Sequence, residues 1–582
     1  MAWNRHTTLV VVATLATLAL GTAATPLWDE DEARFATIAR AMVESGDWVV
    51  PRFNGTLAVD KPVLMHWCMA ACMTVFGQSE FAARLPSMIA TLLTGLALAR
   101  AGRRWFDSTT GVVAALAHAG CLLVAIEAHA ATPDAILTAL VTWSTVLLAE
   151  AITPTAMEGL GRPGLGRAVG IGGLLGLAVV CKGPIGFIGP LAVVGLWAWC
   201  LAARRRWDQR RPRGIGETVA AAAAATVDAA RSLRPITITL AALAAALPWY
   251  VAVTLRSDGA WTMGFFLVHN VGRFLAPMEK HSGGFLFHPL TMLVGFYPWS
   301  CFLPFAVVVG AWRTWRHDDR EPAGAGMLLS LVWLAVWVGG FSAAATKLPN
   351  YVLPAYPAAA LLVAVIAVDA VRRATASGWP HPRWLTTGVA CLAFGGVATA
   401  ATLVLAGRLG IPAAGSAAVV GIVPLIGAAA CWHHAGRRPM AALATFCITG
   451  LVYAGAMVGP AQARVAKANT LPAFVAGLRA APGGARIGTY VLPSPNVVFY
   501  AHQPVTRIAD GDLASVAAFL RSGPDAVLLV PEDEYASIRD RLPSGCGERA
   551  RTRPVFRRHD VIAVGSAGGD HGRTAATPEV TR

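Results

Sequence analysis

The sequence predicts a polytopic α-helical membrane protein with a small α/β domain near its C-terminal end. Of its 582 residues, 55% are hydrophobic and only 14% are charged, and the mean hydropathy is +0.54. A soluble protein of this length needs far more charged surface. Apolar runs of about 20 residues, the length that crosses a bilayer core, recur along the first three quarters of the chain. After residue 459 the composition becomes that of a soluble domain.

The apolar runs predict about thirteen membrane spans. The N-terminal stretch resembles a signal peptide, because Arg5 precedes an apolar run. It has no A-x-A cleavage site, so we interpret it as an uncleaved first span. The approximate limits of the spans are 8–25, 81–101, 110–127, 134–152, 168–182, 184–202, 235–255, 286–312, 325–345, 352–370, 385–406, 416–432 and 440–458.

Three regions follow from this pattern. We expect residues 1–460 to form one transmembrane module, residues 461–566 a small soluble α/β domain, and residues 567–582 a disordered tail. Within the soluble domain the patterns predict strands at 485–492, 525–531 and 558–565 and helices at 511–522 and 532–542.

The basic residues set the orientation. The net charge is +15, but it lies in short loops rather than in the aromatic-rich basic patches that bind nucleic acid. The positive-inside rule therefore places these loops, the N-terminus and a predicted surface helix at 214–233 in the cytoplasm, and the C-terminal domain outside. The protein is expected in the plasma (inner) membrane. The basic positions and segments are Arg5, Arg103-Arg104, 204–213, Arg313 to Arg316, Arg372-Arg373 and Arg437-Arg438.

Four consecutive carboxylates, Asp29-Glu30-Asp31-Glu32, follow the first span on the predicted outer face. Clustered acids beside a membrane repel one another unless cations, a metal or a substrate balance them. The alternative is a solvated acidic loop. Residues 32–45 then predict a helix with an apolar stripe, ended by Gly46, that lies in the membrane interface.

Three motifs follow one another in the outer loop 26–80. They are DEARFATIARAM at 31–42, SGDWVVP at 45–51 and KPVLMHW at 61–67. In combination they resemble the first outer loop of the ArnT/PMT-type glycosyltransferases, a group that includes the lipid A 4-amino-4-deoxy-L-arabinose transferase. The resemblance covers roughly residues 1–460 and fades in the C-terminal domain.

This resemblance implies a GT-C fold with an active site on the outer face and a polyprenyl-phosphate sugar as donor. It implies that Asp31 is the catalytic-site acid, Arg34 its neighbouring arginine and Lys61 a phosphate-binding lysine. The position of Arg34, three residues on, selects Asp31 over the other acids. Asp60 stands where the family has a glutamate, so a divalent metal at Asp60 and His269 is left open.

The second outer loop offers another acid. Asp134 resembles the family's second-loop acid and is a candidate catalytic residue. Its alternative role is a helix N-cap, since aspartate is favoured just before a helix. Lys182 also resembles a short family motif, but a lysine at the end of a span can simply extend its amine to the interface.

Two further outer segments carry candidate substrate-binding residues. The sequence HNVGRF at 269–274 resembles a family loop that closes over the donor, which implies donor or phosphate contacts for His269 and Arg273. The sequence KLPNYVLP at 347–354 resembles a family segment whose lysine and tyrosine, here Lys347 and Tyr351, meet the phosphate of the lipid carrier. The topology rule favours lysine inside, whereas Lys347 falls outside.

The expected activity is transfer of a sugar from a polyprenyl phosphate to a lipid or cell-envelope glycan. Fixed cations stabilise the departing phosphate, and a carboxylate can act as general base or orient a cationic group. One alternative is protein O-mannosyl transfer. Others are a transporter or flippase of lipid-linked substrates, which would place charges at the bilayer midplane and show internal repeats, and a noncatalytic assembly factor.

Overall fold

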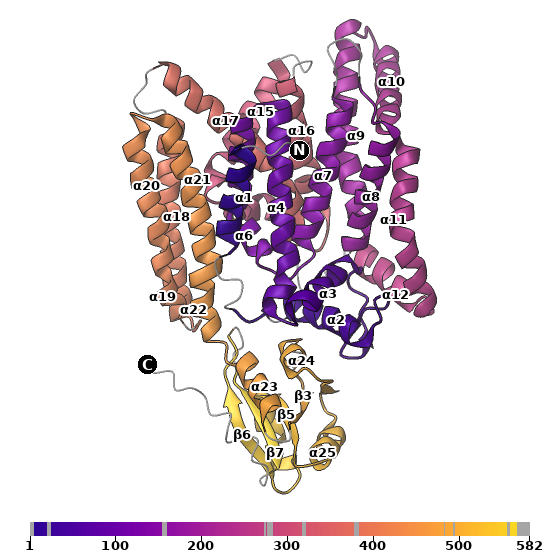
Figure 1. Cartoon of the computed structure of the whole chain (residues 1–582), viewed down its shortest axis with the longest axis vertical. Helices are drawn as coiled ribbons and strands as arrows, with labels where there is room; N and C mark the ends of the chain where they lie inside the picture. Colours follow the sequence, from indigo (N-terminus) through magenta and orange to yellow (C-terminus); the bar gives the residue numbers. More distant parts are fainter. Residues whose placement is uncertain are drawn as a thin grey trace.

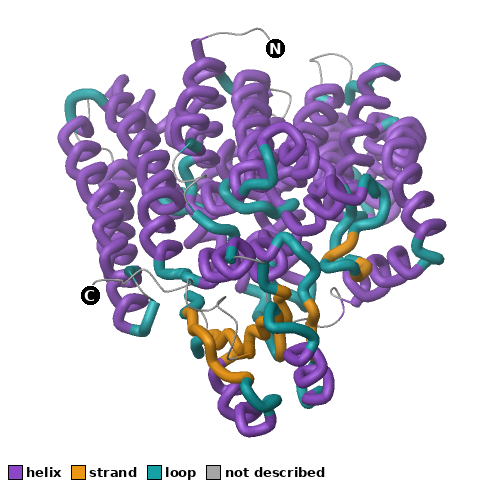
Figure 2. The backbone as a smooth tube through the Cα atoms, turned by 60° about the horizontal axis from the view of Figure 1, so that its bottom comes forward, coloured by secondary structure: helices purple, strands orange, loops and turns teal. Residues whose placement is uncertain are grey.

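The computed structural model consists of a large helical bundle with a small mixed domain at one end (Figure 1). Strands are confined to that small domain and to a short hairpin beside the bundle (Figure 2). The structure describes residues 5–19, 25–28, 30–153, 160–272, 275, 283–316, 322–377, 383–411, 413–481, 484–492, 495–555 and 559–566. The predicted tail at 567–582 lies outside these ranges.

Membrane-spanning helices make up the bundle. In the described part of the chain, ten helical segments are long and apolar enough to cross a membrane, or up to 11 if the bent pair α5–α6 is one span. The helices are α4 (Glu80–Trp105), α7 (Asp134–Ile152), α8 (Leu165–Lys182), α9 (Ile185–Gln209), α11 (Pro235–Arg256), α16 (Pro322–Ala343), α17 (Tyr356–Ser377), α18 (Arg383–Arg408), α20 (Ile422–Ala435) and α21 (Pro439–Ala456), with α5 (Ser108–Ala119) and α6 (Leu122–Ala128) as the bent pair.

Besides the bent pair α5–α6, two predicted spans contain no single membrane-length helix within the described residues. The first is α1 (Arg5–Leu18), which packs against α4, α5 and α21. The predicted span 286–312 is divided into α14 (Phe287–Gly295), a short helical turn η2 (Trp299–Cys301) and α15 (Leu303–Arg316). Pro298 lies at this break, where proline removes a backbone donor and clashes with the preceding turn.

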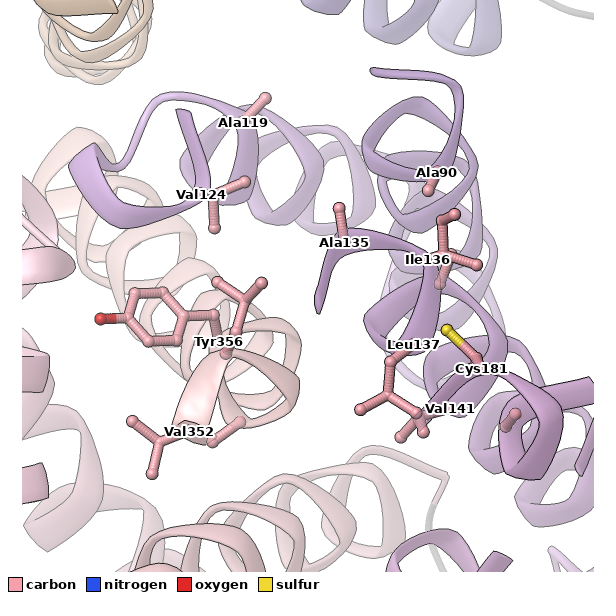
Figure 3. Close-up of a cluster of buried hydrophobic side chains, with 14 of the residues drawn as sticks. Ala90, Ala119, Val124, Ala135, Ile136, Leu137, Val141, Cys181, Val352 and Tyr356 are labelled. Carbon is pink, nitrogen blue, oxygen red and sulfur yellow. The ribbon is translucent and has the colours of Figure 1, made fainter. Parts of the chain in front are cut away.

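Helices α8 and α11 pack closely against each other along part of the bundle. A Cβ on Gly172 or Gly176 of α8 would lie 2.5 or 2.4 Å from backbone oxygens of α11, so only glycine allows this approach. Figure 3 shows Leu137 and Val141 of α7 beside Cys181 of α8. These contacts fix the outer end of α8 next to the start of α7.

The outer loop forms a helical layer beneath the bundle. It contains α2 (Asp31–Ser45), the hairpin strands β1 (Arg52–Phe53) and β2 (Thr56–Leu57), and α3 (Leu64–Phe76). Gly46 ends α2 in a left-handed conformation with φ 71°, as predicted.

The predicted membrane-interface position of α2 is corrected. Phe35, Ile38, Ala39 and Met42 are all at most 2% exposed, and α2 packs against α3 and α24 (Pro495–Ala501). Protein therefore buries the apolar stripe. The predicted amphipathic pattern is present, but α2 packs against α3 and the C-terminal domain rather than against lipid.

The C-terminal domain is built on a five-stranded sheet with the order β4-β3-β5-β7-β6. Strand β3 pairs in parallel with β4 and β5, while β7 pairs antiparallel with β5 and β6. The predicted strands are β3 (Arg486–Tyr490), β5 (Ala526–Pro531) and β7 (Val561–Ser566), and the predicted helices are α25 (Leu513–Arg521) and α26 (Glu532–Ile538). The elements not predicted are α23 (Leu471–Ala480), α24, β4 (Thr506–Ile508) and β6 (Cys546–Thr552).

Hydrogen bonds from the outer loop hold this domain to the bundle. Arg40 of α2 donates from Nη1 to Phe499 O at 2.5 Å and from Nη2 to Val498 O at 3.1 Å. The Asn54 side chain exchanges two hydrogen bonds with the backbone of Val505. The C-terminal domain is thus docked on the layer that carries Asp31.

Candidate active site

A cavity of about 200 Å³ lies where the outer loop meets the ends of the bundle helices. Its polar and charged lining comes from four parts of the chain: the segment before α3, the outer end of α8, the helix η1 (Gly264–Gly272) and the segment between α16 and α17. Side chains far apart in sequence therefore converge. The lining residues are Asp60, Lys61, Leu137, Lys182, Ile185, Phe265, His269, Asn270, Phe341, Ala344, Thr346 and Tyr351.

Asp60 and Lys61 form the outer-loop wall of the cavity, and Arg34 pairs with Asp60 behind it. Arg34 Nη2 lies 3.2 Å from Asp60 Oδ1, and the guanidinium stands 5.1 Å from the centre of the Phe53 ring. Burial alone would raise the pKa of Asp60, but the Arg34 and Lys61 charges outweigh it, so this pKa is lowered. Asp60 therefore remains a carboxylate that holds Arg34 in place.

Asp31 is the first residue of α2 and stays exposed to solvent beside the cavity. Its pKa is raised, first because surrounding protein desolvates the carboxylate and then because Asp134 and Asp60 lie near; Lys61 acts in the opposite direction. The Asp31 carboxylate therefore lies within electrostatic range of Lys61, Asp60 and Asp134. A carboxylate with a raised pKa is a better proton acceptor at neutral pH.

Glu32, the next residue, is buried and fixes the start of α2. Its two carboxylate oxygens accept from Arg84 Nε at 2.9 Å and Arg84 Nη2 at 2.8 Å. The same oxygens accept from the backbone N–H of Trp28 and, at 2.7 Å, from that of Ala131. One buried carboxylate thus joins the outer loop to α4 and to the loop that carries Asp134.

Asp134 begins α7 and forms an ion pair with Lys182 at the end of α8. Both side chains are largely buried, with 5% and 14% exposure. The N-cap of α7 is Pro133, and no side chain caps this helix, so the N-cap alternative for Asp134 does not hold. Glu127 lies nearby, where it accepts a 2.8 Å hydrogen bond from the Thr132 hydroxyl.

The third outer segment enters the cavity through η1. This helix has π-type winding and carries His269 and Asn270 into the lining. Phe265 stacks on Trp261 with ring centres 4.9 Å apart, which anchors the segment. Arg273 lies outside the described residues.

Lys347 and Tyr351 are separated in the structure. Tyr351 lines the cavity, and its ring centre is 5.2 Å from Lys182 Nζ. Lys347 is only 4% exposed and donates to Ser342 O at 2.6 Å and Phe341 O at 3.1 Å, at the C-terminal end of α16. Its amine thus satisfies helix carbonyls, as cations do at helix C-termini. It does not line the cavity in this conformation.

The described residues contain no group of three or more His, Cys, Asp or Glu side chains that could hold a metal ion. Asp60 and His269 share the cavity wall, but the Asp60 carboxylate is engaged by Arg34. These residues do not fit a metal site, and the chemistry below uses none.

The sequence pattern missed three of these contributors. Glu127 is a single acid inside an apolar run, a signal of function that was available, because buried acids in spans are costly. Glu32 looked like one of four equivalent acids, and Arg84, inside the predicted span 81–101, was given no role. The ion pair between Glu32 and Arg84 joins positions 52 apart in the chain, so no local sequence pattern indicates it.

Comparisons with known proteins agree with this geometry. Residues 60–229 match the family described as dolichyl-phosphate-mannose-protein mannosyltransferase. This range contains Asp60, Lys61, Asp134 and Lys182.

Two curated relatives are undecaprenyl phosphate-alpha-4-amino-4-deoxy-L-arabinose arabinosyl transferases. The chain is 32% identical over 378 residues to the protein of Pseudomonas paraeruginosa, covering 64% of this chain and 61% of the relative. It is 29% identical over 360 residues to that of an Enterobacter species, covering 61% and 58%. The matches span less than two thirds of either relative's length.

Among solved structures, the chain resembles ArnT from Cupriavidus metallidurans bound to undecaprenyl phosphate. The TM-score is 0.75 at 20% identity, and the match covers 98% of this chain and 99% of that one. The likeness establishes the fold of the whole chain. Together with the outer-loop motifs, these matches identify this multi-span membrane protein as an ArnT/PMT-type protein with a GT-C fold.

Proposed function

We propose that this protein is a membrane glycosyltransferase that moves a sugar from a polyprenyl phosphate to a lipid or cell-envelope glycan. The observation that carries the proposal is the cavity lined by Lys61, Lys182, Tyr351 and His269, whose two lysines interact electrostatically with Asp31. Cations in a partly closed cavity suit a phosphate that gains negative charge as it leaves.

In the proposed reaction an oxygen of the acceptor bonds to the anomeric carbon while the bond from that carbon to the donor phosphate breaks. The electron pair of the broken bond goes to the phosphate. In this proposal Lys61 and the Tyr351 hydroxyl bind that phosphate, which is supported by the position of both residues in the cavity lining. Polyprenyl phosphate is the leaving product.

Asp31 acts on the acceptor side. For a hydroxyl acceptor, its carboxylate takes the proton as the new bond forms. For an acceptor that is already an ionised phosphate, it instead orients the cationic region of the sugar. Asp134 remains paired with Lys182 and holds that amine toward the cavity.

The first sugar to test is 4-amino-4-deoxy-L-arabinose, because the curated relatives carry that name and the solved structure holds undecaprenyl phosphate. The matched family model instead names mannosyl transfer to protein, which keeps protein O-mannosylation as a second candidate. We propose a plasma-membrane location with the site and the C-terminal domain outside, as the basic loops predict.

The test is mass spectrometry of envelope lipids, glycans and proteins from cells with and without the gene. We expect one sugar modification to disappear and to return with the wild-type gene but not with Asp31→Asn. A loss restricted to glycosylated proteins would favour the second candidate. An unchanged envelope, or full rescue by Asp31→Asn, would contradict the proposal.

A further inference from the structure

A second cavity, of about 420 Å³, lies at the end of the molecule opposite the C-terminal domain, where α9 and α10 (Ile215–Leu233) run side by side (Figure 1). Four arginines line it, and among the described residues of its lining Asp228 is the only acid. The arginines are Arg162 before α8, Arg205 and Arg206 on α9, and Arg231 on α10. This cavity is far from Asp31 and takes no part in the proposed sugar transfer.

The four arginines differ in their interactions with neighbouring residues. Arg206 donates to Asp228 from both Nε, at 2.9 Å, and Nη2, at 2.6 Å. The side chains of Arg162, Arg205 and Arg231 have neither a hydrogen bond nor an ion pair with any residue in the described ranges. Three guanidinium groups therefore converge on a cavity that contains one neutralised acid, a pattern that suits an anionic ligand.

The position of this cavity relative to the membrane surface indicates which kind of anion it binds. Arg162 lies three residues before α8 begins, and Arg231 four residues before α11 begins. The neighbouring positions Leu165 and Ile236, on these two spans, are 62% and 75% exposed. The cavity therefore lies where lipid-facing apolar surface changes to basic surface, which is the level of phospholipid headgroups.

We propose that this cavity binds the headgroup of an anionic phospholipid of the cytoplasmic leaflet. The phosphate lies among Arg162, Arg205 and Arg231, and the acyl chains follow the exposed apolar positions of α8 and α11. The volume is within the range of small-ligand sites. Asp228 holds Arg206 in place and leaves the other three guanidinium groups to the lipid.

The test is native mass spectrometry of the full chain with phosphatidylglycerol and phosphatidylcholine of matched acyl chains. We expect selective retention of phosphatidylglycerol. The double variant Arg205→Gln/Arg231→Gln should weaken this retention about thirtyfold, the factor expected for two basic residues at a membrane surface. Arg205→Lys/Arg231→Lys should keep most of it, because the charge remains.

The matched control is Arg437→Gln/Arg438→Gln, which removes two charges from another basic loop on the same predicted face and should leave retention unchanged. Equal loss in this control would overturn the proposal, since it would indicate nonspecific attraction. A second experiment adds glycerol 1-phosphate, a water-soluble compound that has the phosphate and glycerol of the lipid headgroup but no acyl chains. Displacement of the lipid by micromolar glycerol 1-phosphate would assign the cavity to a soluble phosphate compound and overturn the lipid assignment.

Discussion

Asp31 keeps contact with solvent while Lys61, Asp60 and Asp134 act on it electrostatically. The motif DEARF, with arginine three residues after the aspartate, predicts this acid as the catalytic-site residue. Family motifs also placed Lys61 and Tyr351 in one cavity. They could not show that Lys347 turns toward the carbonyls of α16, because this depends on how the segment after that helix folds.

Asp31→Asn tests the acid directly. The amide cannot accept a proton, so kcat/KM should fall by about 10²–10⁴-fold, the usual contribution of a general acid or base. Steady-state rates with a labelled lipid-linked sugar measure this. Glu44→Gln, an exposed position on the same helix, is the control and should keep wild-type rates.

The acidic limb of the pH–rate profile tests how burial and Lys61 affect the pKa of Asp31. Because desolvation raises the pKa of Asp31, activity should be lost, as pH falls, above the ordinary aspartate value of 3.8. Lys61 opposes this shift, so Lys61→Met should move the limb to still higher pH as well as lower the rate. A limb that does not move in Lys61→Met would contradict the proposed coupling of these two groups.

At the scale of elements, Glu32 and Arg84 tie the first turn of α2 to α4 and to the loop before α7. Both side chains are almost fully buried, at 5% and 1% exposure. The sequence predicted α2 closely, because its apolar spacing and Gly46 are local signals. It missed β4, which has three residues, and β6, whose sequence CGERART lacks the apolar alternation of a strand.

Glu32→Ala should destabilise the protein by about 3–5 kcal/mol, because the buried Arg84 guanidinium keeps its hydrogen bonds to Thr25 and Pro26 but loses the opposite charge of Glu32. Thermal unfolding in detergent measures the change. The double variant Glu32→Leu/Arg84→Met, which removes both charges, should recover part of the loss. A Glu32→Ala protein as stable as wild type would rule out the pair as the anchor of α2.

For the whole molecule, docking of the C-terminal domain is the feature least visible in sequence. Its sheet could be predicted from apolar strands, but its partner could not, because the α2 stripe suited lipid as well as protein. Arg40 of α2 is only 4% exposed and bonds backbone carbonyls of α24. This contact joins the domain to α2, the helix that begins at Asp31.

Arg40→Ala should loosen this docking, because each hydrogen bond to a charged group contributes about 1.5–3 kcal/mol. We expect faster hydrogen exchange in α24 and faster proteolysis between the two parts. Arg486→Ala, which removes a surface ion pair with Asp525 inside the domain, should not change exchange in α24. Identical exchange in wild type and Arg40→Ala would show that other contacts hold the interface.

The most direct test of sugar transfer uses the full chain in proteoliposomes with a labelled polyprenyl-phosphate sugar. Our account predicts release of free polyprenyl phosphate that depends on an acceptor and is lost in Asp31→Asn and Lys61→Ala. Movement of the intact lipid-linked sugar across the bilayer without its cleavage, or release at wild-type rates in both variants, would contradict it.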